Sequence, residues 1–204
     1  MIVIDVETTG LNPYKHSIIS LGAVILKKNP ETFYEECRPY DGAEITQKAL
    51  EINGFTKDYI MNVNRSLKEL CLDFLEWSSH TRNKTLAGHN ISFDSNFLKH
   101  SFGLNGIEWH FGYHYLDLHS IAYAEFLKKG VKIPTRKGVS VLGLDTILKE
   151  VGIPKRIGIH NALEDAKLTA ELFYRLIYVK ERDKTALFSE FKKYDTHQLY
   201  LFDD

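Results

Sequence analysis

Three segments in the first part of the chain carry the apolar, β-branched pattern that is typical of strands. They are residues 1–5 (MIVID), 18–26 (IISLGAVIL) and 32–38 (TFYEECR). Turn-forming residues separate them, at residues 10–13 (GLNP) and 29–30 (NP). The short intervals between these segments favour an antiparallel meander.

From Ser66 onward the apolar positions recur at helical spacing. Ser66 and Glu69 have the arrangement of a capping box, and the apolar face that follows consists of Leu67, Leu70, Cys71, Phe74 and Leu75. A short apolar run at residues 85–88 then precedes further helical patterns, which cover residues 94–100, 118–128, 141–151 and 162–180. Strands followed by alternating strand and helix predict an α/β fold with a mixed sheet.

Length and composition indicate one globular domain. The 204 residues are 44% hydrophobic and 26% charged, which excludes a disordered, collagen-like or coiled-coil chain. We expect this domain to occupy residues 1–194, with its last helix ending near Tyr194. Residues 195–204 (DTHQLYLFDD) are expected to form a detachable tail.

Cysteine usage and hydropathy indicate a cytoplasmic protein. The only cysteines, Cys37 and Cys71, do not form a C-x-x-C pair, so they provide neither a disulfide framework nor a thiolate zinc site. The longest apolar stretch, residues 18–26, is too short to span a membrane, and the N-terminal residues lack the pattern of a signal peptide. We therefore expect neither a secreted nor a membrane-spanning protein.

The net charge of −1 conceals a basic segment. Residues 128–156 contain eight lysines and arginines against two acidic residues, which is a local charge of +6. Such a segment suits a polyanionic partner, although a run of lysines is more often a solvated surface.

Two carboxylates follow the first apolar strand. Asp5 and Glu7 are two residues apart, so strand alternation places both side chains on one face. The first lysine or arginine of the sequence is Lys15, and a hard cation such as Mg²⁺ or Mn²⁺ is therefore a suitable partner for the pair. A strand that ends at Asp5 in a solvated turn would explain the same residues.

The second cluster, residues 88–94 (GHNISFD), lies where a buried strand is predicted to give way to a helix. Ligands of α/β proteins bind at such strand ends. Asp94 is also favourable there simply as an anion at the positive end of a helix, and His89 is compatible with a simple turn.

The third cluster, residues 160–165 (HNALED), opens the last long helix. Asn161 and Glu164 have the spacing of a capping pair, which explains both without any chemistry. Asp165 lies on the apolar face of this helix, so we expect it to point toward the core. His160 could reach into a site as a general base, although a lone histidine at such a position is more often a surface residue.

Together, the three clusters resemble the motifs of the DEDDh exonuclease family, also called DnaQ-like. The matching patterns are D-x-E-T-T-G from Asp5, H-N-x-x-F-D from His89 and H-x-x-x-x-D from His160. Residues 45–54 (ITQKALEING) are similar to the family's segment between the hairpin and the first long helix, and the resemblance covers about residues 1–178.

The resemblance implies a ribonuclease-H-like fold, in which helices flank a mixed sheet with an antiparallel hairpin meander and parallel strands. It also implies an enzyme that removes nucleotides one at a time from 3′ ends and releases nucleoside 5′-monophosphates. By this resemblance Asp5, Glu7, Asp94 and Asp165 would hold two divalent cations, Mg²⁺ or Mn²⁺, and His160 would deprotonate the attacking water.

The same resemblance implies contacts with nucleic acid. Thr8 and Leu11 would approach the terminal nucleotide, and His89 and Asn90 would lie beside the strand. Asn53 stands where some relatives carry a histidine near the terminal sugar and phosphate. The basic segment would guide the rest of the strand by salt-sensitive phosphate contacts.

The tail carries a separate signal. Residues 198–202 (QLYLF) resemble the Q-L-x-L-F peptide by which bacterial replication and repair proteins dock on the sliding clamp. The docking residues would be Gln198, Leu199, Leu201 and Phe202. The alternative is that these apolar side chains fold back onto the core.

The leading hypothesis is a DNA 3′→5′ exonuclease of replication proofreading or repair, which acts on single-stranded 3′ ends and works with a DNA polymerase. The alternative is an exoribonuclease that trims RNA 3′ ends, because no residue plainly reads or excludes a 2′-hydroxyl. A non-catalytic module that binds a clamp or polymerase is a third hypothesis, and the intact carboxylates and His160 weigh against it.

Overall fold

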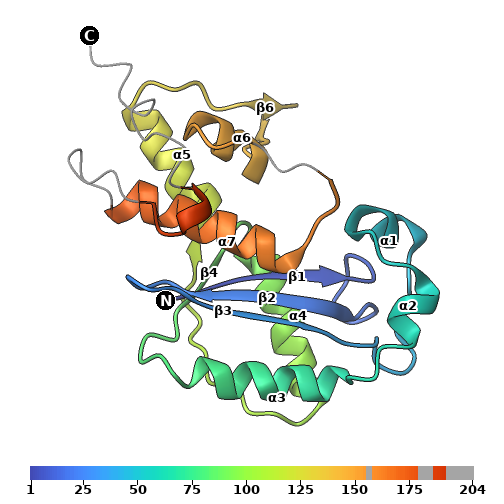
Figure 1. The fold of residues 1–204 in the computed structure, drawn as a ribbon. Helices are drawn as coiled ribbons and strands as arrows, with labels where there is room; N and C mark the ends of the chain where they lie inside the picture. Colours follow the sequence, from blue (N-terminus) through green and yellow to red (C-terminus); the bar gives the residue numbers. More distant parts are fainter. Residues whose placement is uncertain (155–157, 179–185, 192–204) are drawn as a thin grey trace.

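The fold is built around a five-stranded sheet with the strand order β3-β2-β1-β4-β5 (Figure 1). A computed structural model describes residues 1–154, 158–178 and 186–191. The strands are β1 (Ile2–Thr8), β2 (Ile18–Ile25), β3 (Glu31–Glu36), β4 (Leu86–Gly88) and β5 (Leu116–Asp117). The first three form an antiparallel meander, and β4 and β5 extend it in parallel to β1. The predicted mixed sheet is confirmed.

Helices cover both faces of this sheet (Figure 1). On one face lie α3 (Leu67–Ser78) and α4 (Ile91–Leu104), and on the other lie α5 (Leu118–Lys128), α6 (Leu144–Glu150) and α7 (Ala162–Phe173). The side chains of β1 divide between two apolar clusters, with Ile2, Ile4 and Val6 beside α3 and α4, and Val3 beside α7. Because alternate residues of a strand share a face, Asp5 and Glu7 point to the α7 side.

Several helix boundaries follow the local signals of the sequence. The Ser66 and Glu69 capping box of α3 is present, and α5 has the predicted bounds. Two starts differ from expectation. Helix α4 begins at Ile91 rather than near residue 94, and α6 begins at Leu144 because residues 135–140 form a small hairpin, β6 (Thr135–Arg136) and β7 (Val139–Ser140).

Two short helices, α1 (Gln47–Asn53) and α2 (Lys57–Met61), were not predicted. Thr46 and Thr56 cap them, and the structure buries only Leu50 and Asn53 of α1 and Ile60 of α2. So few buried positions leave no apolar stripe in the sequence, which is why the periodicity does not reveal these helices.

Helix α7 is shorter than the helical pattern at residues 162–180 predicted, and the expected helix end near Tyr194, with the domain boundary at residue 194, lies outside the described residues. Helix α7 ends at Phe173, a π-helical turn covers Tyr174–Tyr178, and Ser189–Phe191 form a separate 3₁₀ turn. A buried ion pair explains the return of the chain. Arg175 Nε donates to Glu171 Oε1 at 2.7 Å, and Glu171 Oε2 accepts hydrogen bonds from the backbone N–H groups of Leu187 and Phe188.

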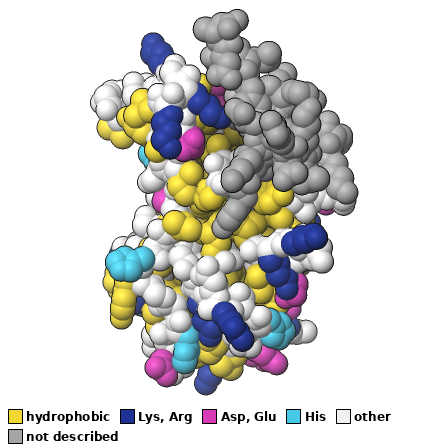
Figure 2. Space-filling model, turned by 90° about the vertical axis from the view of Figure 1, so that its left-hand side faces the viewer, with side chains coloured by type: hydrophobic (Ala, Val, Ile, Leu, Met, Phe, Trp, Pro, Cys, Tyr) yellow, Lys and Arg dark blue, Asp and Glu magenta, His cyan; other side chains and the backbone are white. Residues whose placement is uncertain are grey.

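The basic residues of the segment that begins at residue 128 are exposed in its described part. They are Lys128, Lys129, Lys132, Arg136, Lys137 and Lys149. Figure 2 shows lysine and arginine side chains at the height of α5 and α6, above a band of hydrophobic side chains. Below this band, on the same face, basic side chains are mixed with acidic ones and histidines (Figure 2).

Three further expectations concern cysteines, membranes and the tail. Cys37 and Cys71 are both free and buried, so no disulfide links them. Among the helices of the described chain, none is long and apolar enough to cross a membrane. Residues 195–204, which include the proposed clamp-binding peptide, lie outside the described residues.

Candidate active site

Strand β1 supplies the first two carboxylates. It continues through Thr8, so the alternative of a strand that ends at Asp5 in a solvated turn is wrong. Glu7 is buried and Asp5 is half-buried, and both point to the face that α7 covers. This face must therefore accommodate two negative charges, as expected from the sequence.

Helix α7 reaches this pair because a glycine lets it approach the sheet. Gly22 of β2 lies opposite Asp5 in the antiparallel register. A Cβ atom at Gly22 would lie 2.2 Å from the carbonyl carbon and oxygen of Ala162, so no other residue fits without moving the helix. The first turn of α7 is thus held directly over the carboxylates of β1.

Asn161 caps the start of α7 as predicted, but Glu164 does not complete the capping pair. The Asn161 side chain accepts hydrogen bonds from the backbone N–H groups of Leu163 and Glu164, each at 3.1 Å. Glu164 does not take the expected second half of the capping pair, because its carboxylate contacts Lys167 at 3.0 Å. The cap fixes the backbone at residue 161, so His160 emerges at a defined position beside the site.

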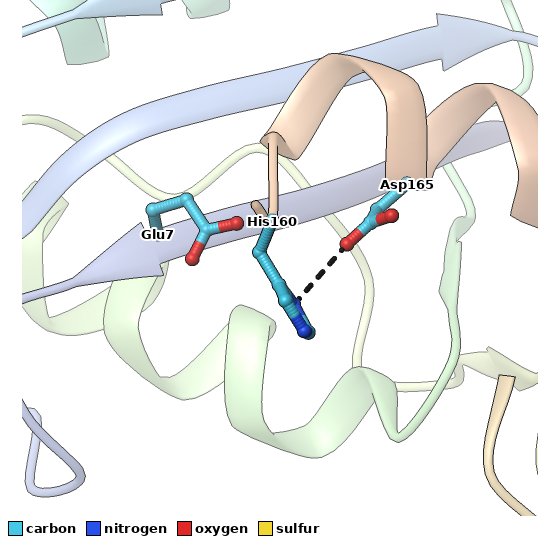
Figure 3. Close-up of side chains that lie close together, drawn as sticks. All are labelled: Glu7, His160 and Asp165. Carbon is cyan, nitrogen blue, oxygen red and sulfur yellow. Dashed lines mark ion pairs between the residues drawn. The ribbon is translucent and has the colours of Figure 1, made fainter. Parts of the chain in front are cut away.

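Glu7, His160 and Asp165 converge on one point (Figure 3). One ligand atom from each of these residues lies within 4.8 Å of the others. His160 Nδ1 lies 3.5 Å from Asp165 Oδ2, and Asp165 is buried as its position on the apolar face predicted. Figure 3 shows Glu7 entering from β1, His160 from the loop before α7 and Asp165 from the helix itself.

Asp94 joins the site from the first turn of α4. Its Oδ1 accepts a hydrogen bond from the backbone N–H of Val6 at 3.0 Å, which ties α4 to the strand between Asp5 and Glu7. Burial, together with the charges of Glu7 and Asp117, raises the pKa of Asp94 to about 8, despite the opposing hydrogen bond from Val6. Glu7, Asp94 and Asp165 therefore lie near one another at the end of β1 and the start of two helices, and Asp5 lies on the same face of β1 as Glu7.

Sequence reasoning missed Asp117. It ends β5, caps α5 through a hydrogen bond from the Ser120 N–H and accepts another from the Ile91 N–H at 3.1 Å. Its charge acts on Asp94, and its bond to Ile91 holds the turn that begins α4. The available signal was an aspartate directly before the apolar pattern at residues 118–128, which is a typical N-cap.

Some of the residues expected to touch nucleic acid form hydrogen bonds within the protein, whereas others are exposed. The Thr8 hydroxyl donates to the Gly10 carbonyl at 2.7 Å, and Asn53 Nδ2 donates to the Thr8 carbonyl at 3.1 Å. Asn53 is buried and also accepts from the Phe55 N–H, so it fastens α1 to the end of β1. Leu11, in contrast, is 84% exposed.

The second motif shows a similar division. His89 Nε2 lies 3.2 Å from the Leu142 carbonyl, which links this motif to the segment after the β6–β7 hairpin. Asn90 is exposed and has a left-handed backbone with φ of 58°, a conformation uncommon for residues other than glycine. The nucleotide contacts of Thr8, Asn53, His89 and Asn90 stay predictions.

The donor set fits a hard divalent cation. Carboxylate oxygens are the ligands that Mg²⁺ and Mn²⁺ prefer, and a single imidazole beside them is compatible with both ions. Asp5, Glu7, Asp94 and Asp165 could supply these oxygens. The clustering of Glu7 and Asp165, with Asp94 nearby, favours a cation, because carboxylate charges repel one another in a partly buried environment.

The raised pKa of Asp94 predicts how the metal-free protein depends on pH. Between pH about 4 and 8 the folded protein keeps a proton on Asp94 that the unfolded chain releases, so this group lowers the stability as pH rises through that window. Asp94→Asn should therefore raise the melting temperature in chelator more at pH 8 than at pH 5. Asp41→Asn, at an exposed position, is the control, and an unchanged or lower melting temperature of Asp94→Asn at pH 8 would contradict the prediction.

Comparison with known proteins identifies relatives over nearly the whole chain. A family model described as an exonuclease, RNase_T, matches residues 2–173. The chain is 29% identical over 196 residues to a PolC-type DNA polymerase III of Thermotoga maritima, which covers 94% of this chain but only 13% of that protein. It is 26% identical over 185 residues to a 3′-5′ DNA exonuclease, Cap18, of Escherichia coli, which covers 89% of this chain and 93% of the relative.

A ribonuclease T of Shewanella denitrificans is 25% identical over 189 residues, covering 86% of this chain and 79% of the relative. Among solved structures, the nuclease domain of 3′hExo, a DEDDh family member bound to rAMP, has a TM-score of 0.68 at 20% identity over 86% of this chain and 90% of that one. The exonuclease I of Methylocaldum szegediense has a TM-score of 0.67 at 22% identity and covers 87% of this chain and 40% of that one. These structures share the ribonuclease-H-like fold.

Proposed function

The chain belongs to the RNase_T exonuclease family, and from this premise we propose that it is a metal-dependent 3′→5′ exonuclease that hydrolyses DNA and releases nucleoside 5′-monophosphates. The observation that carries the proposal is the convergence of Glu7, His160 and Asp165, with Asp94 close enough for the charge of Glu7 to act on it. This is a site with several carboxylates and one accessible base at the end of a parallel strand, where α/β proteins bind their ligands.

Each residue has a role in this proposal. Asp5, Glu7, Asp94 and Asp165 would hold two divalent cations, Mg²⁺ or Mn²⁺, which would supply electrostatic stabilisation of the attacking and leaving oxygens of the phosphodiester. His160 accepts a proton from the attacking water, and its half-exposed ring gives it access to solvent. Asp165 would help to orient the ring, because its Oδ2 lies 3.5 Å from Nδ1.

The relatives support DNA as the substrate and keep RNA as the alternative. The DNA exonuclease Cap18 matches the chain over most of both lengths, and so does a ribonuclease T. The PolC-type relatives are about eight times longer than the matched part, so a link to replication proofreading or repair, and to a DNA polymerase, is part of the proposal. A cytoplasmic location is also part of the proposal.

Digestion of end-labelled oligonucleotides tests the function. With Mg²⁺ or Mn²⁺, 5′-labelled single-stranded DNA should shorten from its 3′ end in steps of one nucleotide, and excess chelator should abolish the shortening. Matched RNA, and DNA duplexes with a mismatched 3′ end, measure the substrate preference in the same assay. Thermal stability should rise on addition of Mn²⁺, because an ion that binds only the folded state stabilises it. Undiminished digestion in chelator, or cleavage within the strand, would reject the proposal.

Two further parts of the proposal concern partners. The exposed basic residues from Lys128 to Lys149 would contact phosphates of the longer substrate, and the His89 contact with Leu142 connects this region to the site. Gln198, Leu199, Leu201 and Phe202 would dock on a bacterial sliding clamp, a proposal that rests on the similarity of the peptide alone.

A further inference from the structure

A groove of about 850 Å³ lies between the loop after β1 and the exposed side of α4. Its lining residues are Leu11, Asn12, Pro13, Tyr14, Asn96, Lys99, His100, Gly103 and Leu104. Leu11 follows the end of β1, so its end of the groove lies near the candidate active site. The α4 residues that line the groove lie on the exposed side of the helix, away from the buried Asp94. Lys99 is five residues beyond Asp94, which is about 7.5 Å along the helix axis.

The loop that forms one wall of the groove is held in one conformation. The Lys15 and His16 N–H groups donate to the Asn12 carbonyl at 3.0 and 2.8 Å, and the Tyr14 N–H donates to Asn12 Oδ1 at 2.9 Å. Yet this loop exposes Leu11 and 78% of Tyr14. Large apolar side chains on an ordered loop can bind a ligand without the entropic cost of ordering the loop.

Tyr14, Lys99 and His100 line the groove, and the Tyr113 ring lies beside Lys99. The Tyr14 ring lies edge-on to the His100 ring, with 4.9 Å between the ring centroids. On the other side, Lys99 Nζ lies 5.0 Å from the centroid of the Tyr113 ring, and Tyr113 is 76% exposed. Exposed aromatic rings next to a lysine are the combination with which proteins bind single-stranded nucleic acid, through base stacking and phosphate contacts.

The charge of the groove fits a polyanion. Its described lining contains Lys99 and His100 and no carboxylate. A second groove, beside β3, differs in this respect because Glu35, Glu36 and Glu69 line it together with a single arginine. Phosphates would therefore be attracted to the groove along α4 and repelled by the one beside β3.

We propose that the groove along α4 binds the nucleotides directly upstream of the one that is removed. Bases stack on Tyr14 and Tyr113, and Lys99 contacts a phosphate between them. The proposal rests on the proposed exonuclease function for the direction of the strand, and it makes single-stranded nucleic acid the substrate class. It predicts little sequence preference, because every base presents a face on which a tyrosine ring can stack.

Binding of a fluorescein-labelled thymidine decanucleotide, measured by fluorescence anisotropy in Ca²⁺, tests the groove directly. Tyr14→Ala and Lys99→Ala should each weaken binding about tenfold. Lys28→Ala, an exposed lysine at the opposite end of the sheet, is the control and should bind as wild type. Lys99→Ala should also lower the slope of log Kd against log salt concentration by about 0.7, whereas Tyr14→Ala should leave it unchanged.

The inference is overturned if Tyr14→Ala and Lys99→Ala both bind the decanucleotide as tightly as wild type. It is also overturned if Lys28→Ala weakens binding by the same factor. A second assay separates this result from the proposed function. The 4-nitrophenyl ester of thymidine 5′-monophosphate contains the terminal nucleotide and nothing upstream. In Tyr14→Ala and Lys99→Ala, the ratio of kcat/KM for the decanucleotide to kcat/KM for the ester should be about tenfold lower than in the wild type.

Equal losses on both substrates would mean that the variants disturb the reaction centre, and would overturn the inference. If the wild-type protein with Mg²⁺ or Mn²⁺ hydrolyses neither substrate, the proposed function fails. The anisotropy measurement then still decides whether single-stranded nucleic acid occupies the groove, because binding in Ca²⁺ does not depend on turnover.

Discussion

Replacing Asp165 with asparagine is expected to lower exonuclease turnover by at least about 10³-fold, since a metal site contributes several kcal/mol of charge stabilisation and each 1.4 kcal/mol is tenfold in rate. Asparagine has nearly the same shape, so the buried position in α7 should stay packed. What the variant loses is one negative charge beside Glu7 and the contact with the His160 ring.

The neighbouring carboxylate provides a matched control for Asp165. Glu164 lies on the same helical turn, is exposed and pairs with Lys167 outside the site. Glu164→Gln should therefore retain wild-type turnover and wild-type Mn²⁺ affinity. Calorimetry should find that Asp165→Asn has lost its Mn²⁺ affinity. If Asp165→Asn keeps both the wild-type rate and wild-type Mn²⁺ binding while remaining folded by circular dichroism, Asp165 has no part in the chemistry.

Removal of the His160 side chain is expected to lower turnover by about 10²- to 10⁴-fold, which is the usual contribution of a general base. His160→Ala should bind Mn²⁺ nearly as wild type, because the carboxylates provide the main donors.

Chemical rescue distinguishes a base from a structural residue at position 160. The ring is half-exposed, so free imidazole can enter the space that alanine leaves and should restore part of the rate. His80→Ala, at an exposed position after α3, serves as the control and should need no rescue. An unchanged rate of His160→Ala across pH 6 to 9 would instead identify His160 as a surface residue.

The sequence predicted the parts of the fold that depend on local pattern. Apolar, β-branched runs located β1 to β3, and the capping box at Ser66 located α3. The alternation of side chains along a strand placed Asp5 and Glu7 on one face, and helical periodicity turned Asp165 inward. These inferences need only the periodicities of strands and helices and the chemistry of caps.

Other features depend on residues far apart in the sequence and could not be predicted. The approach of α7 to β2 depends on the absence of a side chain at Gly22, which is informative only when its partner, Ala162, is known. The return of the chain onto Glu171 likewise requires the tertiary contact with Leu187. The family motifs pointed to candidate site residues, of which the structure brings Glu7, His160 and Asp165 together. The Asp94 contact with the Val6 N–H and the charge of Asp117 became evident only in three dimensions.

The docking of α7 against β1 also sets the order of events during synthesis of the protein. Asp5 and Asp165 are 160 residues apart, and ribosomes add about 5 to 20 residues per second, so roughly 8 to 30 s separate the appearance of the two carboxylates. A nascent chain that already contains β1 and α4 lacks both His160 and Asp165. The closing contact is among the most distant in the sequence and is therefore expected to form late in folding. Ribosome-bound fragments of this chain should consequently be unable to digest nucleic acid until α7 has emerged and packed.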